Sequence, residues 1–180
     1  MKQLVLKERI RIYEESLNQL IGKKTERVVY FEIDSDEAMY DQDDYHSLDY
    51  GLQIQTQTEE KFYFIWGSQY TQFDLKFGKG EIFKEFAKDA ELGIYDVSQH
   101  EKWKPLIQAE IVTLQSYWDH YVQDFPQGVE ITFSNGKQIY VSVISIFDDK
   151  KSYYNFADEM TLFFMNYSEV GRYLDKLSLS

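Results

Sequence analysis

The sequence predicts an α+β protein: a mainly antiparallel sheet built from two amphipathic hairpins and covered by an N-terminal helix, a middle helix and a short C-terminal helix. Two observations support this fold class. Apolar and polar residues alternate on both sides of a turn at 51–66 and again at 128–143, and apolar residues recur at helical spacing near both ends and after residue 80. A chain of 180 residues is long enough to bury one core, so we expect a single domain over 1–180.

The clearer hairpin, 128–143, turns at Ser134-Asn135-Gly136. Asn-Gly favours a two-residue turn, but that register would mix apolar and polar residues on each face. A three-residue loop with Gly136 in the left-handed conformation instead places Ile131 opposite Ile139. The pattern therefore predicts the bulged register. Its apolar face would hold Val129, Ile131, Phe133, Ile139, Val141 and Val143.

The hairpin at 51–66 aligns with this one at an offset of 77 residues, with Gly51 against Gly128. Glu59 stands where Gly136 stands, and glutamate is disfavoured in a left-handed conformation, so we expect a different loop geometry. An internal duplication would explain the alignment. Chance similarity between two amphipathic hairpins would explain it too.

The other elements follow from periodicity and from their boundaries. A helix is predicted over about 5–21, closed by Gly22, and Ser168 is the predicted N-cap of the C-terminal helix. For 106–121 both helical and strand patterns fit, and the β-branched cluster at its centre favours a strand. Further strands are predicted at 27–33, 73–77 and 160–165. The middle helix would bury Ile82, Phe83, Phe86, Ala87 and Ala90 on one face and end at Gly93.

Composition restricts the classes of function. With 31 acidic and 19 basic residues the chain has a formal net charge of -12, which argues against nucleic-acid and anionic-membrane partners and allows a basic protein partner. There is no cysteine, so disulfides and thiolate chemistry are excluded. No apolar run has the length of a membrane span. We expect a cytoplasmic protein without a cofactor; the sequence does not indicate its oligomeric state.

The segment 34–50 contains seven carboxylates and no lysine or arginine, so it is expected to be a long surface loop. Tyrosine suits an interface because it offers a large area with a polar tip. Three interpretations remain open: a solvated acidic loop, a protein-docking surface, and a metal site that includes His46. The spacing is not that of an EF-hand. The candidate binding residues are Asp34, Asp36, Asp41, Asp43, Asp44, Tyr45, Asp49 and Tyr50.

No catalytic motif is found. The chain has three histidines, His46, His100 and His120, and on a strand the neighbouring Asp119 would point away from His120. The glycines at 67 and 78–80 lack the remaining positions of a nucleophile elbow or a phosphate-binding loop. A catalytic site assembled from distant residues stays an open alternative.

The order of residues in 106–165 resembles small uncharacterised bacterial proteins that include immunity-protein families of toxin systems. The resemblance rests on a strand ending in Tyr117 and Trp118, on Phe125-Pro126-Gln127, on the hairpin VEITFSNGKQIYVSV and on the acidic pair Asp148 and Asp149. It carries no functional residue. It implies a cytoplasmic protein that binds and neutralises a toxin without performing chemistry. The leading hypothesis is therefore a non-enzymatic protein-binding domain, and the alternative is an enzyme or a metal-dependent module using the carboxylates of the acidic segment.

Overall fold

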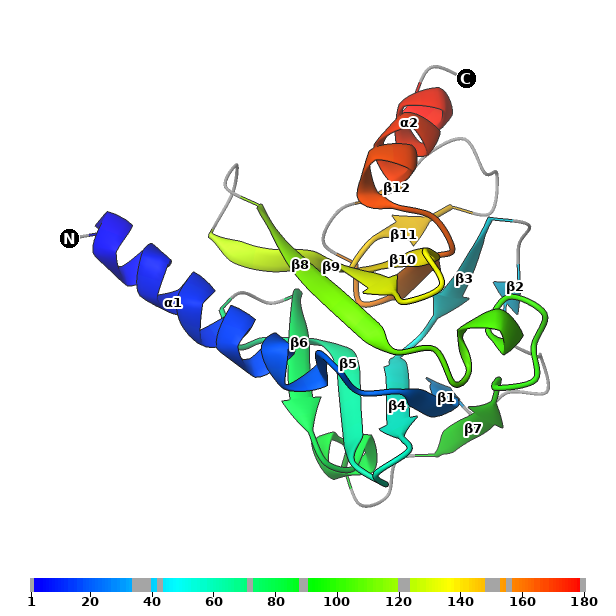
Figure 1. The fold of residues 1–180 in the computed structure, drawn as a ribbon. Helices are drawn as coiled ribbons and strands as arrows, with labels where there is room; N and C mark the ends of the chain where they lie inside the picture. Colours follow the sequence, from blue (N-terminus) through cyan, green and yellow to red (C-terminus); the bar gives the residue numbers. More distant parts are fainter. Residues whose placement is uncertain are drawn as a thin grey trace.

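The computed structural model describes residues 2–33, 40–41, 44–70, 73–87, 91–119, 124–147, 153–154 and 157–178. Within them the chain forms two antiparallel sheets (Figure 1). The first sheet has the order β6 (Asp74–Lys79), β5 (Lys61–Gly67), β4 (Gly51–Thr56), β1 (Thr25–Ile33) and β7 (Leu92–Asp96). The second has the order β2 (Tyr40–Asp41), β3 (Tyr45–Leu48), β13 (Met160–Phe163), β10 (Gln138–Ser142), β9 (Phe125–Phe133) and β8 (Ile111–Asp119). A short ladder joins β11 (Ser145–Ile146) to β12 (Tyr153–Tyr154).

One continuous core joins the two sheets, because apolar residues of both lie in a single cluster. Ile54, Phe62 and Leu75 come from the first sheet, and Ile131 and Val141 come from the second. Two helices pack on the sheets: α1 (Lys2–Leu17) and α2 (Tyr167–Ser178). Three 3-10 turns complete the described structure, η1 (Asn18–Leu20), η2 (Ile82–Glu85) and η3 (Lys104–Leu106). The α+β class and the two hairpins are thus confirmed.

The bulged register of the β9–β10 hairpin is confirmed. Ile131 pairs with Ile139, and Gly136 has a φ of 81°. The apolar face is the one the alternation predicts, because a slip by one residue would turn every side chain over. Its members are at most 1% exposed: Val129, Ile131, Phe133, Ile139, Val141 and Val143.

The predicted difference in the β4–β5 loop is wrong. Glu59 adopts a φ of 62°, the left-handed conformation that Gly136 has in the other hairpin. The N–H of Glu59 donates to the carbonyl of Thr56 at 2.9 Å, as the N–H of Gly136 donates to that of Phe133 at 2.9 Å. The strand pairing on both sides of the turn therefore outweighs the steric cost that glutamate meets at this position.

Removing the steric cost of the left-handed conformation at Glu59 gives a first prediction about stability. Glu59→Gly is expected to raise the free energy of unfolding by up to about 1 kcal/mol, because left-handed φ is unfavourable for glutamate and free for glycine. The reverse change, Gly136→Glu, should lower it by about 1 kcal/mol. Urea unfolding of both variants measures the pair, and a destabilised Glu59→Gly variant would contradict the assigned loop geometry.

The similarity between the hairpins extends to the neighbouring strands. On one side, β1 pairs with β4 and β8 pairs with β9 with a register shift at equivalent places, between Thr25 and Arg27 and between Ile111 and Thr113. On the other side, β6 and β13 occupy equivalent positions beside β5 and β10. Each sheet therefore contains the same four-stranded unit, β1-β4-β5-β6 and β8-β9-β10-β13.

The two units meet in a symmetric way. The N–H of Gly22 donates to the carbonyl of Ile111 at 2.8 Å, and the N–H of Gln108 donates to that of Thr25 at 2.6 Å. Gly22 and Gln108 both have positive φ, 78° and 67°. A shift of 86 residues exchanges the members of this pair of bonds, so the units are related by an approximate two-fold axis. Such equivalences are what a duplication would leave, and an ancestral duplication stays a prediction.

The predicted middle helix is not seen in the described residues. Ile82 begins only the short turn η2, and Phe86 is extended, with φ -96° and ψ 159°. The apolar residues that suggested a helical face pack separately instead, since the Phe86 ring lies 5.0 Å from Tyr50 and stacks on Phe31 at 6.2 Å. Residues 88–90, which include Ala90, lie outside the described part of the chain.

Three further predictions can now be compared with the structure. The strand interpretation of 106–121 is confirmed by β8, although 104–106 form the turn η3. The C-terminal helix is present, but its cap is Asn166 and not Ser168: Asn166 Oδ1 accepts from the N–H of Glu169 at 2.9 Å. Glu169 Oε2 in turn accepts from the N–H of Asn166 at 3.2 Å, which is a capping box.

Candidate functional site

The acidic segment is partly a strand, which corrects its interpretation as one long loop. Residues 45–48 form β3, which pairs with β13 on one side and with β2 on the other, and three of its four side chains are buried. Tyr45 is 1% exposed and its ring lies 5.9 Å from Phe163, so this candidate belongs to the core. Asp44 is exposed, whereas Asp49 and Tyr50 are half-buried between β3 and β4.

The remaining candidates cannot be placed as side chains. Asp34, Asp36 and Asp43 lie outside the described residues. Asp41 is described through its backbone, which pairs with His46 in the β2–β3 ladder. Of the predicted set, the structure therefore brings together Asp49 and Tyr50 at one turn, with Asp44 just before β3.

The carboxyl groups of Glu32 and Asp49 link the end of β1 to the turn after β3, and we call this pair the Glu32–Asp49 clasp. Glu32, at 6% exposure, accepts a hydrogen bond from the N–H of Asp49 at 2.7 Å. Asp49 Oδ2 accepts from the N–H of Ile33 at 3.1 Å, and its carbonyl accepts from Trp66 Nε1 at 2.7 Å. These reciprocal bonds tie the end of β1 to the turn after β3. Ile33 and Asp49 are therefore held next to each other.

The Glu32 carboxyl group of this clasp has an unusually high pKa. Burial raises the pKa of Glu32 to about 8; the hydrogen bond from the Asp49 N–H works against this rise, and the neighbouring Asp49 carboxylate adds to it. At neutral pH Glu32 is therefore mostly protonated. Sequence reasoning did not single out Glu32, and the only signal was a charged residue inside the apolar run RVVYFEI.

His46 and His100, far apart in sequence, lie side by side in a ring cluster. Their ring centroids are 4.7 Å apart, and His46 also lies 4.8 Å from Phe164. Trp103 Nε1, which can only donate, bonds the hydroxyl of Tyr30 at 2.5 Å. That hydroxyl is 2.8 Å from His46 Nδ1, so it can use its own hydrogen toward the imidazole. These contacts fit a packed polar core better than a reactive imidazole, because His46 is fully buried.

The described residues contain no group of side chains typical of a metal site. No three of their histidine, aspartate and glutamate side chains are grouped as metal ligands. His120 and four of the seven carboxylates of the acidic segment lie outside the described ranges, so the metal interpretation is not tested there.

Two shallow grooves lie at equivalent places beside the two four-stranded units. One, between η3, the β9–β10 turn and the start of α2, includes Glu101, Lys137 and Glu169. The other, beside the β4–β5 turn, includes Glu59 and Lys84. Both have side chains of both signs, so neither selects a charged ligand class.

Comparison of the chain with protein-family models, curated proteins and solved structures found no match. In the part of the chain that the structure describes, no helix combines the length and apolar character needed to cross a bilayer.

Proposed function

We propose that this protein is a non-enzymatic protein-binding domain that engages a basic protein, in the manner of an immunity protein that neutralises a toxin. The observation that carries the proposal is the concentration of seven carboxylates, without a lysine or arginine, in 34–50 of a chain with a net charge of -12. Complementary charge speeds association and selects partners of the opposite sign. A cytoplasmic location is part of the proposal.

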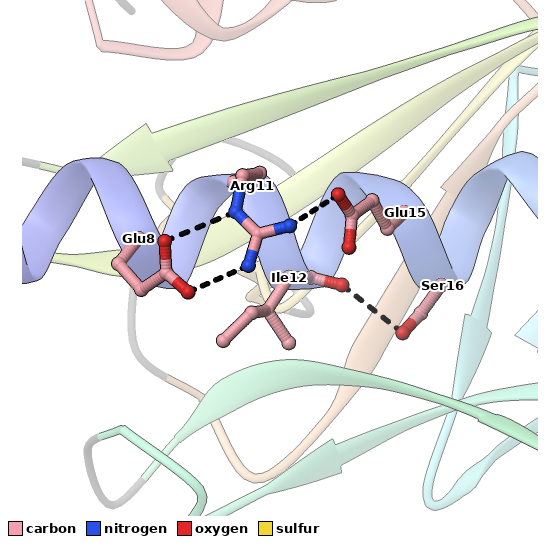
Figure 2. A network of polar contacts seen from close by, with 5 residues as sticks. All are labelled: Glu8, Arg11, Ile12, Glu15 and Ser16. Carbon is pink, nitrogen blue, oxygen red and sulfur yellow. Dashed lines mark hydrogen bonds and ion pairs between the residues drawn. The ribbon is translucent and has the colours of Figure 1, made fainter.

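The ion pairs that the basic side chains form support the proposed function. Arg11 lies between Glu8 and Glu15 on α1 (Figure 2), and its guanidinium bonds Glu8 at 2.6 Å. Both carboxylates raise the pKa of Arg11. Ion pairs of this kind neutralise positive charge locally and leave the acidic excess elsewhere. Ion pairs between different segments of the described chain include Lys23 and Lys79 with Glu60, Arg27 with Asp96, Lys61 with Glu81, and Lys76 with Glu85.

The attachment of the acidic segment to both sheets also supports the proposed function. The clasp of Glu32 and Asp49 fixes one end at β1 of the first sheet and the other at β3 of the second. Binding residues are often carried by loops on rigid supports, because the support limits the entropy lost on binding. Asp34, Asp36, Asp41 and Asp43 stay predicted contact residues.

The test is affinity capture from the native host at low salt, followed by titration of the purified partner. We expect a basic protein whose affinity falls at least ~10-fold between 50 and 300 mM salt, because the attraction is screened. The triple variant Asp41→Asn, Asp43→Asn, Asp44→Asn should weaken binding by ~10-fold or more.

A matched triple variant removes the same charge elsewhere: Glu26→Gln, Asp158→Asn and Asp175→Asn, all at exposed positions. Equal weakening by both triples would show that net charge matters and the acidic segment does not. Failure to retain any basic protein would contradict the proposed function itself.

A further inference from the structure

The strand β7 lies at the margin of the first sheet, next to β1 (Figure 1). The N–H of Val97 donates to the carbonyl of Val28 at 3.0 Å, which fixes the direction in which the backbone groups of β7 point. Alternate residues of a strand direct these groups to opposite sides. Gly93 and Tyr95 therefore bond toward β1, while the N–H and C=O groups of Leu92, Ile94 and Asp96 point away from the sheet. No strand of the described residues pairs with that outer edge.

The other long edge strands are protected. β6 carries Lys76 and Lys79, and charged side chains are a common guard against edge pairing. Along β8, helix α1 packs against the strand, with Glu14 Oε1 accepting from Ser116 Oγ at 3.0 Å. The side-chain amide of Gln115 donates to the Ser116 carbonyl at 3.0 Å and so satisfies that edge acceptor.

β7 is less protected, because its one charged side chain, Asp96, is engaged by Arg27 at 2.7 Å. Its sequence, LGIYD, contains neither proline nor a basic residue, and its central residue Ile94 is 60% exposed. Ile94 stands opposite Phe31, so it shares the outer face of the sheet with Ile33, which is 51% exposed. An exposed β-branched centre on an unpaired edge is what a further strand would cover.

The negative charge of the chain favours a basic binding partner at the outer edge of β7. Ile33 pairs with Leu92 and directly precedes the acidic segment in the sequence, and the exposed Glu91 directly precedes β7. Asp96, the last residue of β7, is paired with Arg27. A second copy of this chain would bring another net charge of -12 to the same place and be repelled. An extended segment rich in lysine or arginine would be attracted.

We infer that the outer edge of β7 is the docking surface for an extended basic segment of the partner protein, which adds to the first sheet as a further strand. The inference rests on the proposed function and names its mode of binding. Backbone hydrogen bonds to Leu92, Ile94 and Asp96 would supply affinity, an apolar side chain would cover Ile94 and Ile33, and a flanking basic residue would lie beside the exposed Glu91.

The test uses the full chain and a synthetic probe, the capped peptide Lys-Lys-Val-Ile-Val-Lys-Lys. Calorimetry at low salt should give a dissociation constant below ~1 mM, a weak affinity that suits a short peptide. N-methylation of alternate peptide bonds, which removes donors and keeps the charge, should weaken binding about 10-fold or more. In hydrogen-exchange NMR the amides of Leu92, Ile94 and Asp96 should become protected.

Two chain variants complete the test. Ile94→Lys should weaken binding about 10-fold or more, since it removes the apolar centre and adds a repelling charge. Ile12→Lys makes the same change at a position of α1 that is 46% exposed, and should leave affinity within about 2-fold. Both variants should keep the melting temperature of the parent chain, because both sites are exposed.

Binding that ignores both N-methylation and Ile94→Lys would overturn the edge proposal and leave charge-driven partner binding standing. Absence of any binding by the cationic peptide would overturn it as well. Partner capture with the acidic-segment variants tests the proposed function separately, so the two failures can be told apart.

Discussion

Replacing Trp103 by alanine is expected to lower the free energy of unfolding by about 3–5 kcal/mol, the largest loss for any single change discussed here. Trp103 is fully buried beside η3, where its ring lies 5.6 Å from Phe164 and 6.4 Å from Tyr30. Truncation would leave a cavity at the point where the two sheets share their core. It would also remove the Nε1 donor that bonds the Tyr30 hydroxyl.

Thermal and urea unfolding measure this loss, and we expect a fall in melting temperature of roughly 10 °C for a chain of this length. Trp103→Phe keeps a ring and loses the donor, so it should cost less and remain measurable if the alanine variant fails to fold. Trp118→Ala serves as the matched control. That ring is only half-buried, with Nε1 bonded to Ser116 Oγ at 3.2 Å. A larger loss at Trp118 than at Trp103 would contradict the assigned core.

The stability of the protein is expected to fall as pH rises from about 5 to 8, because of Glu32. Burial, with the Asp49 carboxylate close by, raises the pKa of Glu32 from 4.5 to about 8 in the folded protein. Between these values the folded chain holds a proton that the unfolded chain has released. The contribution is therefore fully present below pH 4.5 and lost as pH approaches 8.

Glu32→Gln keeps the shape and cannot ionise, so it should flatten this part of the profile. We expect the parent melting temperature to fall by ~5 °C or more between pH 5 and pH 8.5, and that of the variant to change much less. Glu60→Gln is the control, because Lys23 and Lys79 lower the pKa of Glu60 to about 2 and its charge is constant in this range. Equal pH dependence in the parent chain and Glu32→Gln would refute the assignment.

Local patterns predicted much of the fold because the deciding interactions are local in sequence. Alternation around Ser134 to Gly136 gave the register of one hairpin, and helical spacing gave α1. Glu59 shows the limit of such reasoning. Propensity argued against its conformation, and the strands on both sides imposed it. The expected middle helix is likewise not formed in the described residues, where Phe86 is extended and packs on Phe31 and Tyr50.

The site was harder to predict because it depends on contacts between distant segments. Nothing local in sequence joins His46 to His100, or Glu32 to Asp49, and their proximity follows from strand order. Tyr45 was chosen as a surface residue because its neighbours are acidic, yet pairing of β3 with β13 buries it. Composition can locate an acidic stretch, but it does not reveal which of its residues face the core.

The approximate two-fold relation has a consequence for how the chain is held together. Helix α1 precedes the first four-stranded unit and packs on both β6 of that unit and β8 of the second, whereas β7 precedes the second unit and pairs with β1 of the first. The segment that precedes each four-stranded unit therefore contacts the other unit, as an exchanged N-terminal arm does between the subunits of a dimer. If the backbone were cut between β6 and β7, the two pieces are therefore expected to stay associated through the β1–β7 pairing and the shared core.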